Sequence, residues 1–179
     1  MDVAHLEVIR TTVDRFLASC AERYDRAGAI VLDIAPNTSE GARPHFVRAT
    51  VETLDIAPDA GATYVADITA TNDAVIPPGR FDHVVCTEVL EHTLQPFDAV
   101  REIERVLKPG GLVFVTVPFN FRMHGPLPDC WRFTEHGLRA LFRNFTVVEL
   151  AEVETVGRFL MPIQYTLIAA KPPSAPTSA

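Results

Sequence analysis

The chain has 179 residues, of which 47% are hydrophobic and 22% are charged, and its formal net charge is -7. This length and balance are typical of one globular domain that buries its own core, and they exclude disordered and fibrous proteins. The acidic charge argues against a general binder of nucleic acid, which needs clustered lysines and arginines to contact phosphates.

The N-terminal segment has the pattern of an amphipathic helix. From His5 to about Tyr24, apolar residues recur at intervals of three and four, which places them on one helical face that should lie across a sheet. Gly28 is a natural left-handed cap, and a strand pattern follows at once. We therefore expect residues 1–28 to form a helix packed on the domain that follows.

Short apolar segments with strand character then recur along the chain. The expected strands cover residues 29–32, 49–54, 63–66, 81–86, 112–117, 146–150 and 164–170. Helices are expected over residues 40–48, 96–107 and 134–144. The alternation predicts an α/β fold with a mostly parallel sheet. The last two strands are joined without room for a long helix, which predicts an antiparallel final pair.

An acidic residue follows each of the first three strands, at Asp33, Asp55 and Asp67. Because ligands bind at the carboxyl ends of the strands in open α/β sheets, we expect these three carboxylates to face one ligand. Each aspartate alone could equally cap its own loop.

The segment from residue 118 to 133 has no periodicity, and an irregular segment of that length is usually functional. His124 is its best candidate for a general base, because the pKa of histidine lies near neutrality. Alternatively, His124 and Asp129 merely hold the loop in place. Arg132 could pair with an internal acid or receive an anionic substrate. The aromatic residues could form a substrate lid or pack in the core; they are Phe119, Phe121 and Trp131.

Glu91 and His92 could bind a metal, but the sequence offers no second histidine or acid at a suitable spacing. We therefore expect this pair to open a helix against the sheet, and we expect no metal site. The three cysteines are scattered and form no Cys-x-x-Cys pair, which favours a reducing compartment. The sequence also contains no signal peptide pattern and no apolar stretch long enough to span a bilayer, so we expect a cytoplasmic protein without membrane contact.

Six stretches resemble, in order and spacing, the class I S-adenosylmethionine-dependent methyltransferases, above all the small bacterial group called methyltransferase type 11. They read VLDIAPN, VETLDI, ATYVADIT, FDHVVCTEVLEH, VLKPGGLVFVTVPF and CWRFTEHGLRALF. The resemblance covers roughly residues 29–150 and the last strand. It implies a Rossmann-like sheet of seven mostly parallel strands, with helices on both faces and one antiparallel strand. The chain departs from the family pattern in its first loop, where Ala35, Asn37 and Ser39 replace glycines.

The resemblance also implies which residues contact S-adenosylmethionine. Asp33 and the following turn would approach the methionine part, Asp55 the ribose hydroxyls, and Asp67 the adenine. The expected cofactor-binding residues are Asp33, Ala35, Pro36, Asn37, Asp55, Ile56, Asp67, Ile68, Thr87 and Glu88. The expected substrate-binding residues are His92, Phe119, Phe121, Arg122, Trp131 and Arg132. His124 and Asp129 are the expected catalytic pair.

We therefore expect a methyltransferase domain over residues 29–171, followed by a flexible tail over 172–179. The expected activity is transfer of a methyl group from S-adenosylmethionine to an oxygen or nitrogen atom of a sugar or secondary metabolite. The protein should act as a monomer or homodimer without a nucleic-acid partner. The alternative is a catalytically silent member of the family that serves as a binding or regulatory subunit. A nicotinamide-dependent enzyme fits less well, since the Gly-x-Gly-x-x-Gly turn is absent.

Overall fold

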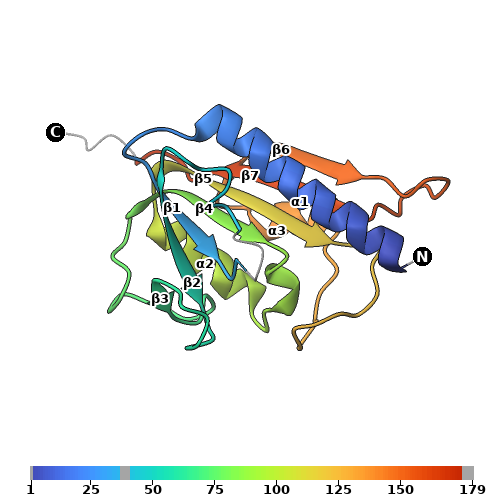
Figure 1. The fold of residues 1–179 in the computed structure, drawn as a ribbon, viewed down its shortest axis with the longest axis horizontal. Coiled ribbons are helices and arrows are strands. Elements are labelled where there is room, and N and C mark those ends of the chain that lie inside the picture. The colour runs from blue at the N-terminus through green and yellow to red at the C-terminus, as the bar shows by residue number, and fades with distance from the viewer. Residues whose placement is uncertain (1, 37–40, 175–179) are drawn as a thin grey trace.

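The computed structural model describes residues 2–36 and 41–174. These residues form a sheet of seven strands in the order β3-β2-β1-β4-β5-β7-β6, with helices on both faces (Figure 1). The strands are β1 (Ile30–Ile34), β2 (Thr50–Asp55), β3 (Tyr64–Val65), β4 (Phe81–Thr87), β5 (Leu107–Pro118), β6 (Thr146–Val153) and β7 (Gln164–Ala170). The helices are α1 (Asp2–Tyr24), α2 (Pro96–Val106), α3 (Glu135–Leu141) and the 3-10 helix η2 (Leu90–His92).

The pairing of the strands confirms the predicted fold class. β1 pairs in parallel with both β2 and β4, and β4 pairs in parallel with β5. β7 runs antiparallel between β5 and β6, which confirms the antiparallel final pair. The chain leaves β1 toward β2 on one side and returns to β4 on the other. The crevice for a ligand in such a sheet lies at this reversal, outside the carboxyl ends of β1 and β4.

Alternate residues of the central strands face the two layers of helices. Phe114 of β5 belongs to the apolar cluster under α1, where its ring stacks on Tyr24 at 5.6 Å and on Phe46 at 5.9 Å. Its neighbours Val113 and Val115 belong to the larger cluster on the opposite face, which contains buried hydrophobic residues of α2 and α3. A strand buried on both faces accounts for the nearly continuous apolar run in the sequence.

Most predicted boundaries shift by a few residues, and two predicted elements differ more clearly from the structure. Residues 41–45 of the helix expected over 40–48 form a turn, with Phe46 N donating to Ala42 O at 2.9 Å, and residue 40 lies outside the described part. β5 begins at Leu107 and not at residue 112 as predicted, so the Lys-Pro-Gly-Gly stretch belongs to the strand. Backbone bonds explain this extension, since Gly110 N donates to Lys171 O and Lys171 N donates to Gly111 O.

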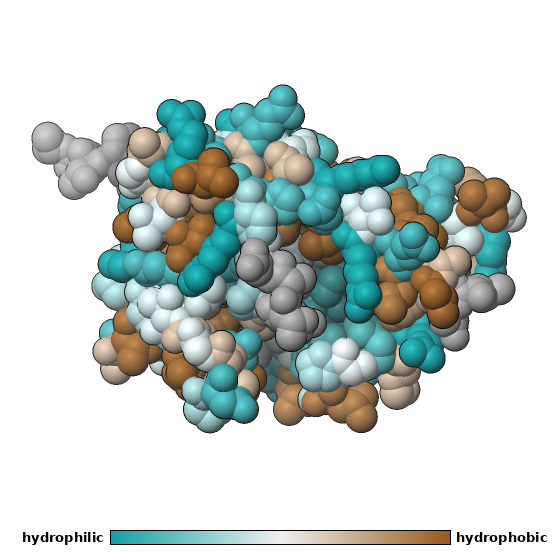
Figure 2. Space-filling view, viewed as in Figure 1, coloured by the Kyte–Doolittle hydropathy of each residue, from teal (hydrophilic) through white to brown (hydrophobic). Residues whose placement is uncertain are grey.

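The surface seen in Figure 2 carries hydrophobic residues in separate patches between polar ones. Across residues 2–36 and 41–174, no helix combines the length and the hydropathy that a crossing of the bilayer requires.

Candidate functional site

A pocket of about 550 Å³ lies at the carboxyl ends of the parallel strands, where the strand order reverses. This volume falls within the range of sites that bind small molecules and cofactors. Its lining residues are Ile34, Ala35, Leu54, Asp55, Ile56, Ala66, Asp67, Ile68, Thr69, Glu88, Val89, His92, Thr93, Leu94, Pro126 and Pro128. Seven of the residues expected to bind cofactor or substrate are therefore brought together at one place.

Asp33 lies beneath the first turn and is only 1% exposed. Its Oδ2 atom accepts a hydrogen bond from Ala42 N at 2.7 Å, and burial raises the pKa of its carboxyl group to about 7. A Cβ atom at Gly41 would lie 2.1 Å from that same oxygen. Gly41 therefore lets the returning chain approach Asp33. The sequence gives no local signal for this role, because the contact between Gly41 and Asp33 forms only when the chain turns back on itself.

Ala35 lines the pocket with a backbone φ of 48°, in the left-handed region that favours glycine. Ala35 therefore adopts a left-handed conformation at a position where the family pattern has glycine. Pro36 follows this residue without contributing to the lining of the described pocket. Asn37 lies outside the described residues.

The second and third strand ends place two aspartates and two isoleucines in the pocket. Asp55 uses Oδ1 to accept from Ala57 N at 2.8 Å, and Asp67 uses Oδ1 to accept from the backbone and hydroxyl of Thr69, both at 2.8 Å. Within the described residues, the second oxygen of each carboxylate has no hydrogen bond. Each aspartate thus caps its own loop with one oxygen, while its other oxygen forms no hydrogen bond within the described residues.

Glu88 lines the pocket directly after β4, in a left-handed conformation with φ 54°. Its Oε1 atom accepts from Thr116 Oγ1 at 2.8 Å and from Gln164 Nε2 at 2.7 Å, and burial raises the pKa of its carboxyl group. Thr87 ends β4 and pairs with Thr116 across the sheet, outside the set of described lining residues. Sequence reasoning missed Thr116 and Gln164, which reach Glu88 only through the sheet topology.

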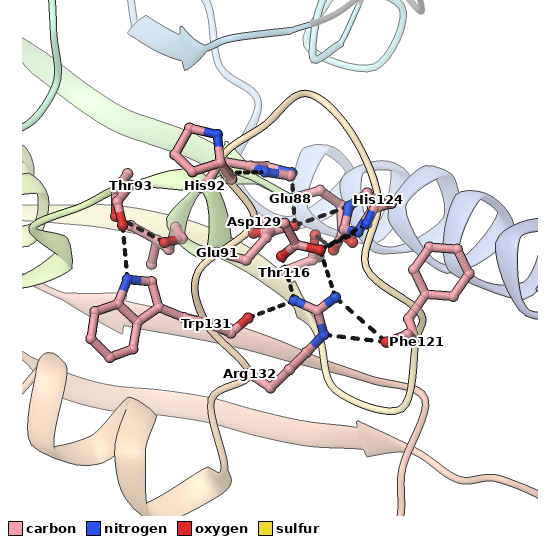
Figure 3. Close-up of polar contacts among 12 residues, drawn as sticks. Glu88, Glu91, His92, Thr93, Thr116, Phe121, His124, Asp129, Trp131 and Arg132 are labelled. Carbon is pink, nitrogen blue, oxygen red and sulfur yellow. Dashed lines mark hydrogen bonds and ion pairs between the residues drawn. The ribbon is translucent and has the colours of Figure 1, made fainter.

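The segment from residue 119 to 133 folds back onto η2 (Figure 3). The backbone oxygen of Glu91 accepts from Cys130 N at 2.7 Å and from Trp131 N at 3.2 Å. The indole of Trp131 donates to Thr93 O at 2.8 Å. Prolines 126 and 128 of the same segment line the pocket. The irregular segment is therefore attached to η2 and to Thr93, beside the pocket that its prolines line.

Asp129 joins His124 and Arg132 within this segment (Figure 3). Its Oδ2 atom lies 3.1 Å from His124 Nδ1 and accepts from Arg132 Nη2 at 2.8 Å, and Arg132 Nη1 lies 2.5 Å from Oδ1. The Arg132 guanidinium holds the pKa of Asp129 well below its usual range, whereas burial lowers the pKa of His124. Arg132 also donates to the carbonyl of Arg122 at 3.0 Å. Its partners are thus an internal acid and the loop backbone.

The aromatic residues of the segment occupy different environments. Phe119 packs on the core against Tyr165, with ring centres 5.9 Å apart. Phe121 contacts the ring of His124 at 5.2 Å, and Trp131, 41% exposed, stacks on Phe133 at 6.1 Å. The side chain of Arg122 is exposed. Of this group, Phe121 lies beside the candidate catalytic pair, and Phe119 serves the core.

Known proteins share both the sequence pattern and the fold. A family model described as a methyltransferase domain matches residues 12–115, more than half of the chain. The ubiquinone biosynthesis O-methyltransferase of Xanthomonas campestris (strain B100) is 35% identical over 98 residues, which are 54% of this chain and 37% of the relative. The chain therefore matches little more than a third of the length of this curated relative.

Solved structures show the same fold at low sequence identity. The crystal structure of the cyclase SpnF superposes with a TM-score of 0.69 at 19% identity, covering 90% of this chain and 81% of that one. The 1,6-didemethyltoxoflavin-N1-methyltransferase of Burkholderia thailandensis, with bound S-adenosylhomocysteine, gives a TM-score of 0.66 at 18% identity, covering 90% and 78%.

Proposed function

The chain belongs to the methyltransferase domain family, and from this membership we propose that it transfers a methyl group from S-adenosylmethionine to a small-molecule acceptor. The observation that carries the proposal is the pocket at the strand ends, which gathers Asp55, Asp67 and Glu88 around apolar walls. Bound S-adenosylmethionine supplies a methyl carbon activated by a positively charged sulfur, so the protein must mainly align the acceptor and exclude water.

The residues at the strand ends fit the parts of this cofactor. The unpaired oxygen of Asp55 suits the ribose hydroxyls, because a carboxylate accepts from both members of a vicinal diol. Ile68, 6% exposed at the base of the pocket, and Ile56 at its rim would flank the adenine ring. Glu88 would lie near the sulfonium, where a negative charge compensates the positive sulfur. Asp33 would act one layer deeper, by holding the turn that carries Ala35.

We assign the acceptor side to the segment from residue 119 to 133 together with His92. Asp129 Oδ2 lies 3.1 Å from His124 Nδ1, so its negative charge would stabilise the imidazolium formed when Nε2 takes a proton from an acceptor hydroxyl. The name of the Xanthomonas relative indicates transfer to oxygen and favours such an acceptor. The net charge of -7 agrees with a small molecule in preference to nucleic acid.

The second candidate is a catalytically silent member of the family that binds a ligand or a partner enzyme. The alanine at position 35, held at φ 48° where the family pattern has glycine, is the observation that favours it. SpnF, named as a cyclase, has the same fold, so the fold alone does not decide the reaction. An activity screen that stays empty despite cofactor binding, together with a co-purifying enzyme, would support this candidate.

Isothermal calorimetry with S-adenosylmethionine and S-adenosylhomocysteine tests the proposal directly. The wild-type chain should bind both, and Asp55→Ala should abolish binding because the ribose loses its acceptor. Asp59→Ala is the matched control, since Asp59 is an exposed acid of the same loop. If neither compound binds at millimolar concentration, the assignment of S-adenosylmethionine as cofactor is refuted. If Asp55→Ala binds them with unchanged affinity, the assignment of Asp55 to the ribose is refuted.

A further inference from the structure

Three side chains beside the pocket converge on one point: Glu91 and His92 of η2, and His124 of the irregular segment. One oxygen or nitrogen atom from each lies within 4.8 Å of the others. The sequence alone could pair only Glu91 with His92. The fold supplies the third side chain, because the backbone bonds of Cys130 and Trp131 to Glu91 bring the segment back over η2.

Glu91 is fully buried, and neither of its carboxylate oxygens has a hydrogen bond within the described residues. Burying a carboxylate without partners costs several kcal/mol in free energy of folding, so such a group normally faces a cation or a donor. Arg132, which lies in the same region, forms its ion pair with Asp129. The arrangement therefore leaves a fully buried acid without a direct counter-charge.

The two histidines present their Nε2 atoms to this acid (Figure 3). His92 Nε2 lies 3.7 Å and His124 Nε2 3.8 Å from Glu91 Oε1. The Nδ1 atom of His92 lies 3.0 Å from Pro128 O, and that of His124 lies 3.1 Å from Asp129 Oδ2. The carbonyl of Pro128 only accepts, so His92 Nδ1 carries a proton and donates it. His124 Nδ1 lies at ion-pair distance from Asp129 without forming a hydrogen bond within the described residues. Metal-binding histidines are oriented in this way, with the second nitrogen held by a carbonyl or carboxylate.

These distances are too long for hydrogen bonds between Glu91 and either histidine. They suit ligands of one ion better, because atoms bound at about 2.0 to 2.2 Å around a common metal lie roughly 3 to 3.6 Å apart. Small side-chain movements would close the difference. Two imidazoles and one carboxylate, with a further position left open, form the usual ligand set of catalytic zinc and related first-row metals.

We propose that Glu91, His92 and His124 bind a divalent first-row metal ion, of which Zn²⁺ is the best fit, at the acceptor side of the pocket. His92 lines the pocket, so the open coordination position faces the bound ligand. This inference rests on the proposed function and deepens it, because the ion would bind the acceptor's hydroxyl oxygen and lower its pKa.

Methyl transfer to the acceptor would then be a single displacement at the methyl carbon. The acceptor oxygen releases its proton to solvent and forms a bond to the methyl carbon, while the bond from that carbon to sulfur breaks. The electron pair of the broken bond stays on sulfur, which becomes the neutral thioether of S-adenosylhomocysteine. With the metal ion bound, His124 Nε2 would be one of its ligands, so the ion instead of His124 would activate the acceptor.

The test is calorimetric titration of the full chain with Zn²⁺ and Mn²⁺ after treatment with a chelator, supported by the visible spectrum of the Co²⁺ form. The wild-type chain should bind one equivalent. Glu91→Gln, which keeps the shape of the side chain, should weaken binding by at least about 100-fold. His124→Ala, in the loop, gives a second variant if Glu91→Gln does not fold. Two control variants, His136→Ala and Cys130→Ser, should bind the metal with wild-type affinity. His136 is an exposed histidine of α3, and Cys130 is an exposed cysteine.

Failure to take up any of these ions would overturn the inference, and so would wild-type affinity in both Glu91→Gln and His124→Ala. Loss of binding in Cys130→Ser would also overturn it, since the thiol would then be the ligand. Titration of the same metal-free protein with S-adenosylhomocysteine separates the two proposals. Binding of that compound without metal uptake would leave the methyltransferase proposal standing and remove only the metal site.

Discussion

Replacement of Asp33 by asparagine should change how the stability of the protein depends on pH. Burial raises the pKa of Asp33 from its ordinary value of 3.8 to about 7. The folded state therefore keeps a proton on Asp33 that the unfolded state releases near pH 4. The resulting stability is fully present below about pH 4 and is lost as the pH rises through 7. At 1.36 kcal/mol per pH unit, the whole effect amounts to about 4 kcal/mol.

Urea unfolding followed by circular dichroism between pH 5 and 8 measures this contribution. Over that range the free energy of unfolding of the wild type should fall by about 3 kcal/mol relative to Asp33→Asn. The comparison between the two proteins removes the contributions of other titrating groups. Asp59→Asn, at an exposed position, should follow the wild-type slope. Parallel curves for the wild type and Asp33→Asn would refute the reasoning, because Asp33 would then have the same pKa in both states.

Three further substitutions test the turn and the core. Gly41→Ala should lower stability by about 2 kcal/mol, because its Cβ would lie 2.1 Å from Asp33 Oδ2 and its φ is 53°; urea unfolding measures this, and wild-type stability would contradict it. Ala35→Gly should raise stability by about 0.5 to 1 kcal/mol, since it relieves a left-handed alanine; a lower melting temperature would contradict it. His83→Phe should gain about 1 kcal/mol, because both buried ring nitrogens lack partners in the described residues. Burial lowers the pKa of His83, so the gain in stability of His83→Phe over the wild type should grow below pH 6.5. A gain that stays constant with pH would show that His83 is not held neutral by burial.

The strands were predictable where burial is continuous, because a run of apolar residues has few other uses in a soluble domain. The last strand, β7, begins and ends at the predicted residues. The Lys-Pro-Gly-Gly stretch lies outside the strand predicted over 112–117, because proline and glycine usually interrupt strands. In the structure, Gly111 packs so closely that a Cβ atom would lie 2.9 Å from Asp82 O, and Lys171 completes the backbone pairing. Such long-range pairing leaves no local trace in the sequence.

The acidic strand ends could be found from the sequence because each lies next to its own strand pattern. Residues that meet only through the fold could not be found in this way. Gln164 reaches Glu88 because β7 inserts beside β5, and His124 reaches Glu91 because the irregular segment bonds back onto η2. Sequence reasoning dismissed a metal at Glu91 and His92 for lack of a third ligand nearby. The nearest suitable side chain is distant in sequence and close only in space.

The two sides of the pocket are built differently, and this difference bears on how the acceptor is selected. Asp55 ends β2 and Asp67 follows shortly after β3, so the sheet largely sets their positions. The side that we assign to the acceptor instead depends on a loop in which Trp131 donates to Thr93 O and Arg132 pairs with Asp129. Those bonds hold the loop near η2, and the loop contributes no strand to the sheet. Changes of residue within the loop can therefore alter the acceptor while the strand ends that we assign to S-adenosylmethionine stay in place.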